Sequence, residues 1–475
     1  MRRIELPRLA LVAVLSALAL GCATQEEPDE TTDEREEATE AFSVPVEYHT
    51  LDNGLKVVLS PDATSPIVTV AVYYNIGFRI EPKQRTGFAH LFEHMMFQGS
   101  KSLGKMEFIQ LVQQNGGILN GSTRYDFTNY FEIVPSHKLE TMLWAEADRL
   151  RGLAITDENL KNQRDVVKNE VRVNVLNQPY GGFPWLDVPQ VAFTNWYNSH
   201  NFYGEMTDLD AATLSDVERF FKSYYAPNNA ALVVVGDFEP KQALTWIRKY
   251  FADIPKAETA PMPDISESPQ KEERRGSRVA PKASRPALAF AYRMPDRGSP
   301  EYFAMGVLDQ ILLQGDDSLL HQALVQRRGF TDQVEGGINW PLGHTFNYNG
   351  PTLWMASLFH DTGVKAGDIV TEVDGAIETL QKKPVDQPRL DRALAKWRSS
   401  FYDAVGSDLG FGRADLLACF ALFDDDPARI NTLDQRLREV TPQLVQSTAK
   451  QYLGRADRTI YTVEPGAAQG QGGGQ

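Results

Sequence analysis

Apolar and polar residues follow one another along this chain with the period of a strand in some stretches and of a helix in others. The β-branched runs at 67–77 and 228–238 predict buried central strands, since nearly continuous apolar stretches of this length suit strands covered on both faces. The stretch 47–60 predicts a hairpin, because Asn53-Gly54 supplies the positive φ that a tight turn requires. The folded part of the chain is therefore expected to begin with a sheet.

Three segments between these strands predict helices. The stretch "GFAHLFEHMMFQGS" at 87–100 predicts an amphipathic helix that ends at Gly99, and a second helix is expected near 104–114. The stretch 160–175 mixes spaced apolar residues with charges and also predicts a helix. Together with the β-rich stretch 123–135, these segments predict an α+β fold.

The length and the changes in composition predict two domains. A chain of 475 residues is too long for one ordinary core and favours two domains of roughly 200 residues each. A proline-, serine- and charge-rich stretch in the middle is typical of a linker, and strand-like apolar sequence resumes after it. The predicted parts are a lipoprotein signal peptide (1–22), an acidic disordered tether (23–43), a first domain (44–258), an interdomain linker (259–285), a second domain (286–464) and a disordered tail (465–475).

The two predicted domains resemble one another in sequence. The sequence at 92–113 parallels that at 308–326, and both contain a Gln-Gly pair by which they can be aligned. This alignment replaces His90 by Gly306, Glu93 by Asp309 and His94 by Gln310. We therefore predict a duplicated domain whose second copy lacks the histidines.

The N-terminal residues indicate export. A basic start and a short apolar run predict a secretory signal, and its end, "LALGC", resembles the lipobox of bacterial lipoproteins. We expect Cys22 to be lipidated and the protein to lie in the bacterial envelope, on the periplasmic side of the outer membrane because Ala23 is not an aspartate. A plain signal peptide is the alternative. The stretch 24–41, with nine acids and one arginine, predicts a solvated tether.

Charge and cysteine content narrow the possible partners. The net charge of −15 and the lack of a basic stripe argue against binding to nucleic acid. Cys419 lies in an apolar run and is predicted to be a buried, inert residue. With Cys22 lipidated, no intramolecular disulfide is available.

One helix carries the groups of a candidate metal site. His90 and His94 are four residues apart and share one helix face, from which both imidazoles can reach one zinc ion. Glu93 faces the same side and could take a proton from water. A catalytic zinc usually has three protein ligands, so a third is needed. The helix at 160–175 offers Glu170 and Asp165, and spacing alone does not choose between them.

The motif His90-Leu91-Phe92-Glu93-His94 resembles the inverted zinc motif of the pitrilysin-type metallopeptidases, which include insulin-degrading enzymes and mitochondrial processing peptidases. The third ligand of that family is a glutamate in a helix further along, where this chain has Glu170 in "VVKNEVR". The resemblance continues through 116–135 and 224–238 and, more weakly, into the second half, so that it covers roughly residues 45–460.

The resemblance implies a zinc-dependent endopeptidase with one Zn²⁺ per chain, built as one half of a clam-like shell from two homologous α+β domains. His90, His94 and Glu170 would bind the ion, and Glu93 would be the general base. The substrate would be a peptide or unfolded segment that pairs as an added strand with a sheet edge near "GGILNGST". There, Asn120 matches an asparagine implicated in holding the substrate backbone; a simple turn residue is the alternative.

Two departures from the family pattern suggest a partner. Gln163 replaces a glutamate that supports the site in many relatives, and it can hydrogen-bond but carries no charge. Active members also take an arginine and a tyrosine from the half without zinc to stabilise the developing oxyanion. The matching positions here are Val325 and Asp332, which cannot do so. We predict a partner subunit of the same fold that supplies the pair, with a homodimer as the fallback.

Two other functions compete with the peptidase. Some relatives are non-catalytic scaffold subunits of respiratory complexes, but these have typically lost the zinc residues that this chain keeps. If the zinc site were structural and not catalytic, Glu93 would have no function there and one coordination position of the ion would remain open.

Overall fold

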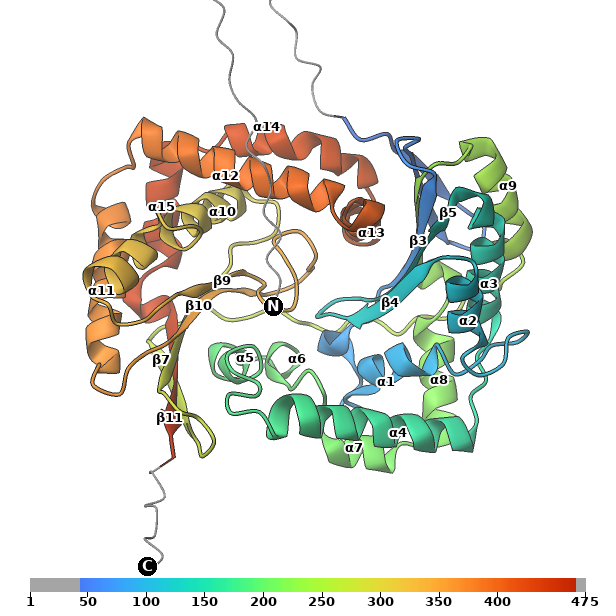
Figure 1. Cartoon of the computed structure of the whole chain (residues 1–475), viewed down its shortest axis with the longest axis horizontal. Coiled ribbons are helices and arrows are strands. Elements are labelled where there is room, and N and C mark those ends of the chain that lie inside the picture. Colours follow the sequence, from blue (N-terminus) through green and yellow to red (C-terminus); the bar gives the residue numbers. More distant parts are fainter. Residues whose placement is uncertain (1–42, 467–475) are drawn as a thin grey trace, which may run out of the picture. The chain divides into compact units, whose positions relative to one another are not determined.

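Two sheets organise residues 43–466, the part of the chain that this computed structural model describes (Figure 1). The predicted signal peptide, the lipidation site Cys22, nearly all of the acidic tether and most of the tail lie outside these residues. Within them, no helix combines the length and the apolar character that crossing a membrane requires.

The first sheet has six strands, and it is mostly antiparallel with one parallel pair, β2 with β6. The predicted hairpin at 47–60 is present as β1 and β2, and Gly54 in its turn has φ 86°. In spatial order the strands are β1 (Glu47–Thr50), β2 (Lys56–Pro61), β6 (Ala230–Gly236), β3 (Ile67–Tyr74), β5 (Thr128–Pro135) and β4 (Ile118–Thr123).

The second sheet repeats this arrangement without a counterpart of β1. It again has a single parallel pair, β7 with β11, at the position that β2 and β6 occupy in the first sheet. Its order is β7 (Arg274–Ala280), β11 (Arg458–Pro465), β8 (Ala287–Arg293), β10 (Leu353–Phe359) and β9 (Glu335–Ile338). The matched strand order is what duplication of one α+β unit produces, and the fold class is α+β.

Most helices of the first half pack around the first sheet. The predicted helix at 87–100 is shorter than expected, because α1 ends at Met95 and the chain then turns towards Gly99, which has φ 111°. The helices are α1 (Phe88–Met95), α2 (Glu107–Gln114), α3 (Leu139–Arg151), α4 (Asp157–Val171), α5 (Asp187–Ala192), α6 (Trp196–Ser199), α7 (Met206–Ala211), α8 (Leu214–Tyr224) and α9 (Pro240–Phe251), with a π-helical segment η3 (Arg172–Leu176) after α4.

The second half carries its own set of helices. These helices are α10 (Pro300–Leu312), α11 (Ala366–Lys382), α12 (Gln387–Gly406), α13 (Phe411–Asp424), α14 (Leu433–Arg438) and α15 (Pro442–Tyr452), with a π-helical segment η5 (His321–Arg327).

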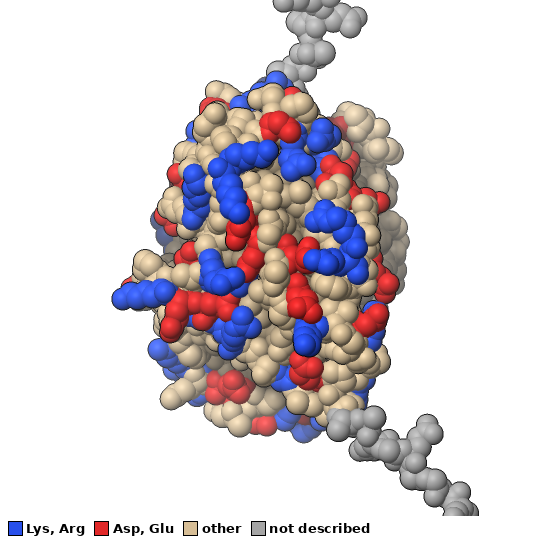
Figure 2. Space-filling view, turned by 90° about the vertical axis from the view of Figure 1, so that its left-hand side faces the viewer, with Lys and Arg blue, Asp and Glu red and all other residues tan. Residues whose placement is uncertain are grey.

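Figure 2 shows one face of the molecule, the left-hand side of Figure 1, where acidic and basic side chains are interspersed.

A helix from each half packs on the sheet of the other half. Helix α13 packs on β2, β3 and β6, and there Tyr73 donates a hydrogen bond of 2.6 Å to Asp415. Helix α5 packs on β7, β8 and β11, where Val188 joins a buried apolar cluster with Ala289 and Val463. Cys419 lies on α13 and is fully buried, as predicted. The apolar faces that cross between the halves hold them together through hydrophobic burial.

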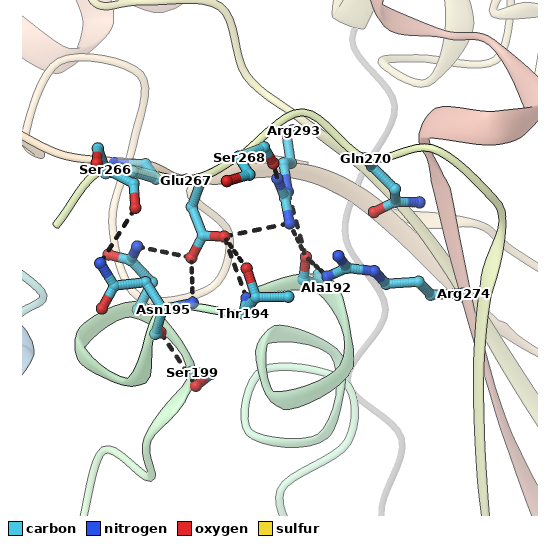
Figure 3. Close-up of polar contacts among 12 residues, drawn as sticks. Ala192, Thr194, Asn195, Ser199, Ser266, Glu267, Ser268, Gln270, Arg274 and Arg293 are labelled. Carbon is cyan, nitrogen blue, oxygen red and sulfur yellow. Dashed lines mark hydrogen bonds and ion pairs between the residues drawn. The ribbon is translucent and has the colours of Figure 1, made fainter.

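The stretch 259–285 is not a linker throughout, because it includes the strand β7. The sequence of β7, RRGSRVA, lacks the apolar run that would indicate a strand, and an edge strand does not need such a run. Upstream of β7, the carboxylate of Glu267 accepts hydrogen bonds from the backbone of Thr194 and Asn195 (Figure 3). It also accepts one from the side chain of Asn198. Arg293 lies 3.3 Å from the same carboxylate. The segment is therefore fixed to both halves.

Replacing Glu267 with glutamine is expected to lower the free energy of unfolding by about 2 kcal/mol at pH 7, since hydrogen bonds to a buried charge are lost. Burial raises the pKa of Glu267, but the hydrogen bonds from Asn198, Thr194 and Asn195 outweigh it and lower the pKa below its usual value. The contribution is therefore present above the unfolded pKa of about 4.3 and is lost as the pH falls through the folded pKa. Urea unfolding at several pH values measures this contribution to the free energy of unfolding.

The exposed Glu272 provides the matched control in the same segment. Glu272→Gln should leave stability unchanged at each pH, whereas the difference between wild type and Glu267→Gln should shrink towards acid pH. Equal stability of Glu267→Gln and wild type at pH 7 would mean that this carboxylate does not hold the segment.

Candidate metal centre

Helix α1 is held at its N-terminus by a buried carboxylate. Glu81 accepts hydrogen bonds from the backbone nitrogens of Gly87 (2.8 Å) and Ala89 (2.5 Å), so it satisfies donors that the first helical turn leaves free. Further along, Phe92 stacks on Phe220 with ring centroids 4.8 Å apart. The apolar residues between the two histidines, Leu91 and Phe92, are fully buried and form the packing surface of the helix.

The structure brings the three predicted ligands together. Helix α1 packs between β4 and α4 (Figure 1), and Glu170 lies on α4. The Nε2 atoms of His90 and His94 are 3.3 Å apart, and they lie 3.5 and 3.3 Å from the two carboxylate oxygens of Glu170. Ligand atoms about 2.1 Å from one zinc ion at tetrahedral angles lie about 3.4 Å from each other. The donor set therefore fits one zinc ion in both chemistry and spacing.

Asp165, the other acid considered from the sequence, is not at the site. It is exposed on α4 and forms an ion pair of 3.0 Å with Lys161. Among the described residues, His90, His94 and Glu170 form the one group of His, Cys, Asp and Glu with the spacing of a metal site.

Glu93 lies beside the cluster and is oriented from the neighbouring strand. Thr123, at the end of β4, donates a hydrogen bond of 2.7 Å to one Glu93 carboxylate oxygen. Among the described residues, no other group hydrogen-bonds this carboxylate, so its second oxygen is open to a water molecule or a substrate. A carboxylate next to a metal site, held by one hydrogen bond, is suited to proton transfer.

The surroundings set the protonation states of these groups. Burial and the neighbouring His94 lower the pKa of His90 to about 4, so its imidazole is neutral and able to bind metal. Burial also lowers the pKa of His94, but the hydrogen bond with Glu170 and the charge of Glu93 outweigh it and raise the pKa. The hydrogen bond from His94 lowers the pKa of Glu170. Burial raises the pKa of Glu93 despite the Thr123 hydrogen bond, which moves this base towards neutral pH.

Gln163 and Asn120, which the sequence also singles out, are not members of the cluster. Gln163 is buried on α4 and hydrogen-bonds His94, while its amide donates to Asn162 at 2.8 Å. Asn120 is exposed on β4, the last strand of the first sheet among the described residues. Since side chains alternate along a strand, Asn120 faces away from the side on which Thr123 meets Glu93.

The sequence did not indicate the aromatic side chains next to the ligands. The Tyr203 ring lies 5.2 Å from the His90 ring, and the Phe202 ring lies 5.6 Å from it. Trp185 packs against both of these rings. Residues 202 and 203 lie in a loop, where no periodic pattern could indicate their position.

The second half does not repeat the metal site. At Gly306, the counterpart of His90, a Cβ would lie 2.2 Å from the ring of Trp397 on α12. Asp309, the counterpart of Glu93, is buried and accepts a hydrogen bond of 2.7 Å from Trp354; burial raises its pKa to about 6. Large aromatic side chains therefore fill the space that metal and water would need.

The residues matched to the missing arginine and tyrosine offer no suitable donor. Val325 lies on η5 and is apolar, and Asp332 is exposed and paired with Arg285 at 3.3 Å. Neither side chain can stabilise a developing oxyanion.

Two family models match the chain. The model described as "Insulinase (Peptidase family M16)" matches residues 56–180, and the one described as "Peptidase M16 inactive domain" matches residues 211–396. The chain belongs to peptidase family M16. The first match contains the candidate ligands and Glu93, and the second contains most of the half in which Trp397 and Trp354 fill the equivalent space.

Individual proteins also match over most of the chain. The zinc protease PqqE of Helicobacter pylori is 25% identical over 425 residues, which are 88% of this chain and 92% of PqqE. The crystal structure of a protease from Helicobacter pylori has a TM-score of 0.80 at 24% identity and covers 89% of this chain and all of that one. The periplasmic protease PqqL from Escherichia coli has a TM-score of 0.71 at 18% identity, and the match covers 90% of this chain but 48% of PqqL.

Proposed function

We propose that the chain is a zinc-dependent endopeptidase, with His90, His94 and Glu170 as ligands of one Zn²⁺ and Glu93 as general base. The observation that carries the proposal is the spacing of 3.3–3.5 Å among three donor groups, with a carboxylate of raised pKa beside them. Bound zinc would act as a Lewis acid that lowers the pKa of a water molecule. Glu93 would take a proton from a water molecule as the water oxygen bonds to the peptide carbonyl carbon, and would give that proton to the amine nitrogen as the C–N bond breaks.

The substrate is proposed to be a peptide or an unfolded segment of a protein. Strand β4 is the edge of the first sheet and lies beside α1, so an extended peptide added to it would pass the candidate metal centre. Asn120 is exposed on this strand and could hold the substrate backbone. Main-chain pairing requires an extended segment, which folded proteins seldom offer.

We propose that a same-fold partner completes the active site. Val325 and Asp332 leave the second half without oxyanion-stabilising donors at the expected positions. The match to about half of PqqL supports a shell made of two such chains. In a heterodimer, a partner that carries the arginine and the tyrosine would supply the groups that stabilise the oxyanion. A homodimer would need other residues in their place.

The place of action is proposed to be the periplasmic side of the bacterial envelope, with the chain anchored through a lipid at Cys22. The apolar N-terminal run ending in "LALGC" supports export and anchoring. The structural match to PqqL, a periplasmic protease, agrees with this location.

Zinc analysis combined with cleavage of quenched peptides tests the proposed function. The purified chain should hold one zinc ion, and cleavage should appear when a same-fold partner is present and stop when a chelator is added. Full cleavage by the chain without a partner would contradict the partner requirement. Zinc without cleavage under any condition would favour the structural site, and a chain that binds no zinc would favour the scaffold.

A further inference from the structure

We infer that Tyr203 is a positioning residue that holds two of the three proposed zinc ligands at once, Glu170 by its hydroxyl and His90 by its ring. The inference rests on the proposed function, since it concerns the same zinc site. Tyr203 is 6% exposed and lies in the loop between α6 and α7, outside the motifs that the sequence indicates.

The hydroxyl of Tyr203 fixes the carboxylate of Glu170. It is hydrogen-bonded to that carboxylate, whose two oxygens lie 3.5 Å from Nε2 of His90 and 3.3 Å from Nε2 of His94. Glu170 is the single ligand on α4, and its side chain is 29% exposed, so packing alone holds it less firmly than the buried His90. A hydrogen bond from a neighbouring group is the usual means by which a protein orients a ligating carboxylate.

The ring of Tyr203 helps to fix His90. The Nδ1 atom of His90 is buried and has no hydrogen-bond partner among the described residues. Ligating histidines usually donate this second nitrogen to an acceptor, which sets the orientation of the ring. Here the edge-to-face contact with Tyr203 and the tilted contact with Phe202 hold the imidazole in place.

The loop that carries Tyr203 is docked tightly on the N-terminus of α1. At Gly204, which has φ 66°, a Cβ would lie 2.2 Å from the backbone nitrogen of Gly87. At Gly87, which has φ 81°, a Cβ would lie 2.6 Å from the carbonyl oxygen of Tyr203. The backbone of Glu205 also donates a hydrogen bond of 2.8 Å to the Thr86 hydroxyl. Tyr203 is thus built into the same rigid unit as the helix with both histidines.

The experiment separates hydroxyl from ring by comparing Tyr203→Phe with Tyr203→Leu. Zinc affinity is measured by competition with a fluorescent chelator, and the ligand geometry by the visible spectrum of the cobalt-substituted protein. Tyr203→Phe should weaken zinc binding about tenfold, and Tyr203→Leu should weaken it further and change the cobalt spectrum. The Tm of the metal-free protein should be the same for Tyr203→Phe and wild type.

Two controls decide between the possible outcomes. Tyr197→Phe removes a hydroxyl from α6, away from the ligands, and should leave zinc affinity unchanged. In a protein that already carries Glu170→Gln, Tyr203→Phe should have less than half of the effect on zinc affinity that it has in the wild type. The reason is that the carboxylate to which the Tyr203 hydroxyl is hydrogen-bonded has been replaced by an uncharged amide. Unchanged zinc affinity in Tyr203→Phe, or an equal effect in both backgrounds, overturns the inference. Lack of zinc binding by the wild type would instead refute the proposed function.

Discussion

Replacing Glu93 with glutamine is expected to lower kcat for peptide cleavage by about 100- to 10,000-fold while zinc remains bound, because general-base catalysis contributes effects of this size. Glutamine has nearly the same shape and can still accept the hydrogen bond from Thr123. It cannot take a proton from water. Zinc content measured beside turnover of a quenched peptide, in the presence of the partner, checks both parts of the expectation.

The exposed Glu218 on α8 serves as the matched control, since Glu218→Gln makes the same chemical change away from the site. It should retain the activity of the wild type. If Glu93→Gln cleaved as fast as the wild type, another group would have to act as the base. Loss of zinc together with activity would instead assign Glu93 to metal binding.

The sequence predicted the part of the site that lies on one helix. His90 and His94 meet because residues four apart share a helix face, and this holds wherever the helix is placed. Glu170 depends on the packing of α4 against α1, which spacing along the chain does not determine. There, the family resemblance identified the residue that the structure brings to the histidines, while Asp165 points to solvent.

The sequence predicted the central strands for a similar reason. Strands such as β3 and β6 are buried on both faces and are therefore continuous apolar runs. The edge strand β7 has a polar sequence, and its pairing with β11 depends on a partner almost two hundred residues away in the chain. The position of Tyr203 likewise depends on contacts across the fold, so local sequence could not reveal it.

Replacing Glu170 with glutamine is expected to weaken zinc binding at least about 100-fold, since loss of a ligand should cost more than the 10- to 100-fold loss typical of groups that support ligands. Glutamine can reach the same point, but it carries no negative charge to offset the charge of the ion. Part of the loss in affinity is therefore electrostatic. Without this charge and the hydrogen bond that His94 donates to Glu170, the pKa of His94 should also fall, which favours its neutral, metal-binding form and offsets a little of the loss.

Asp165→Asn is the matched control for Glu170, because it removes a carboxylate from the same helix, on the exposed side. It should bind zinc as the wild type does, and its effect on stability should be small because an exposed ion pair contributes little. Zinc titration of the three proteins therefore distinguishes a specific ligand from the general negative charge of α4. Equal losses in both variants would indicate that α4 attracts the ion only by its charge, and would leave the site with two histidine ligands, one fewer than a catalytic zinc ion usually has.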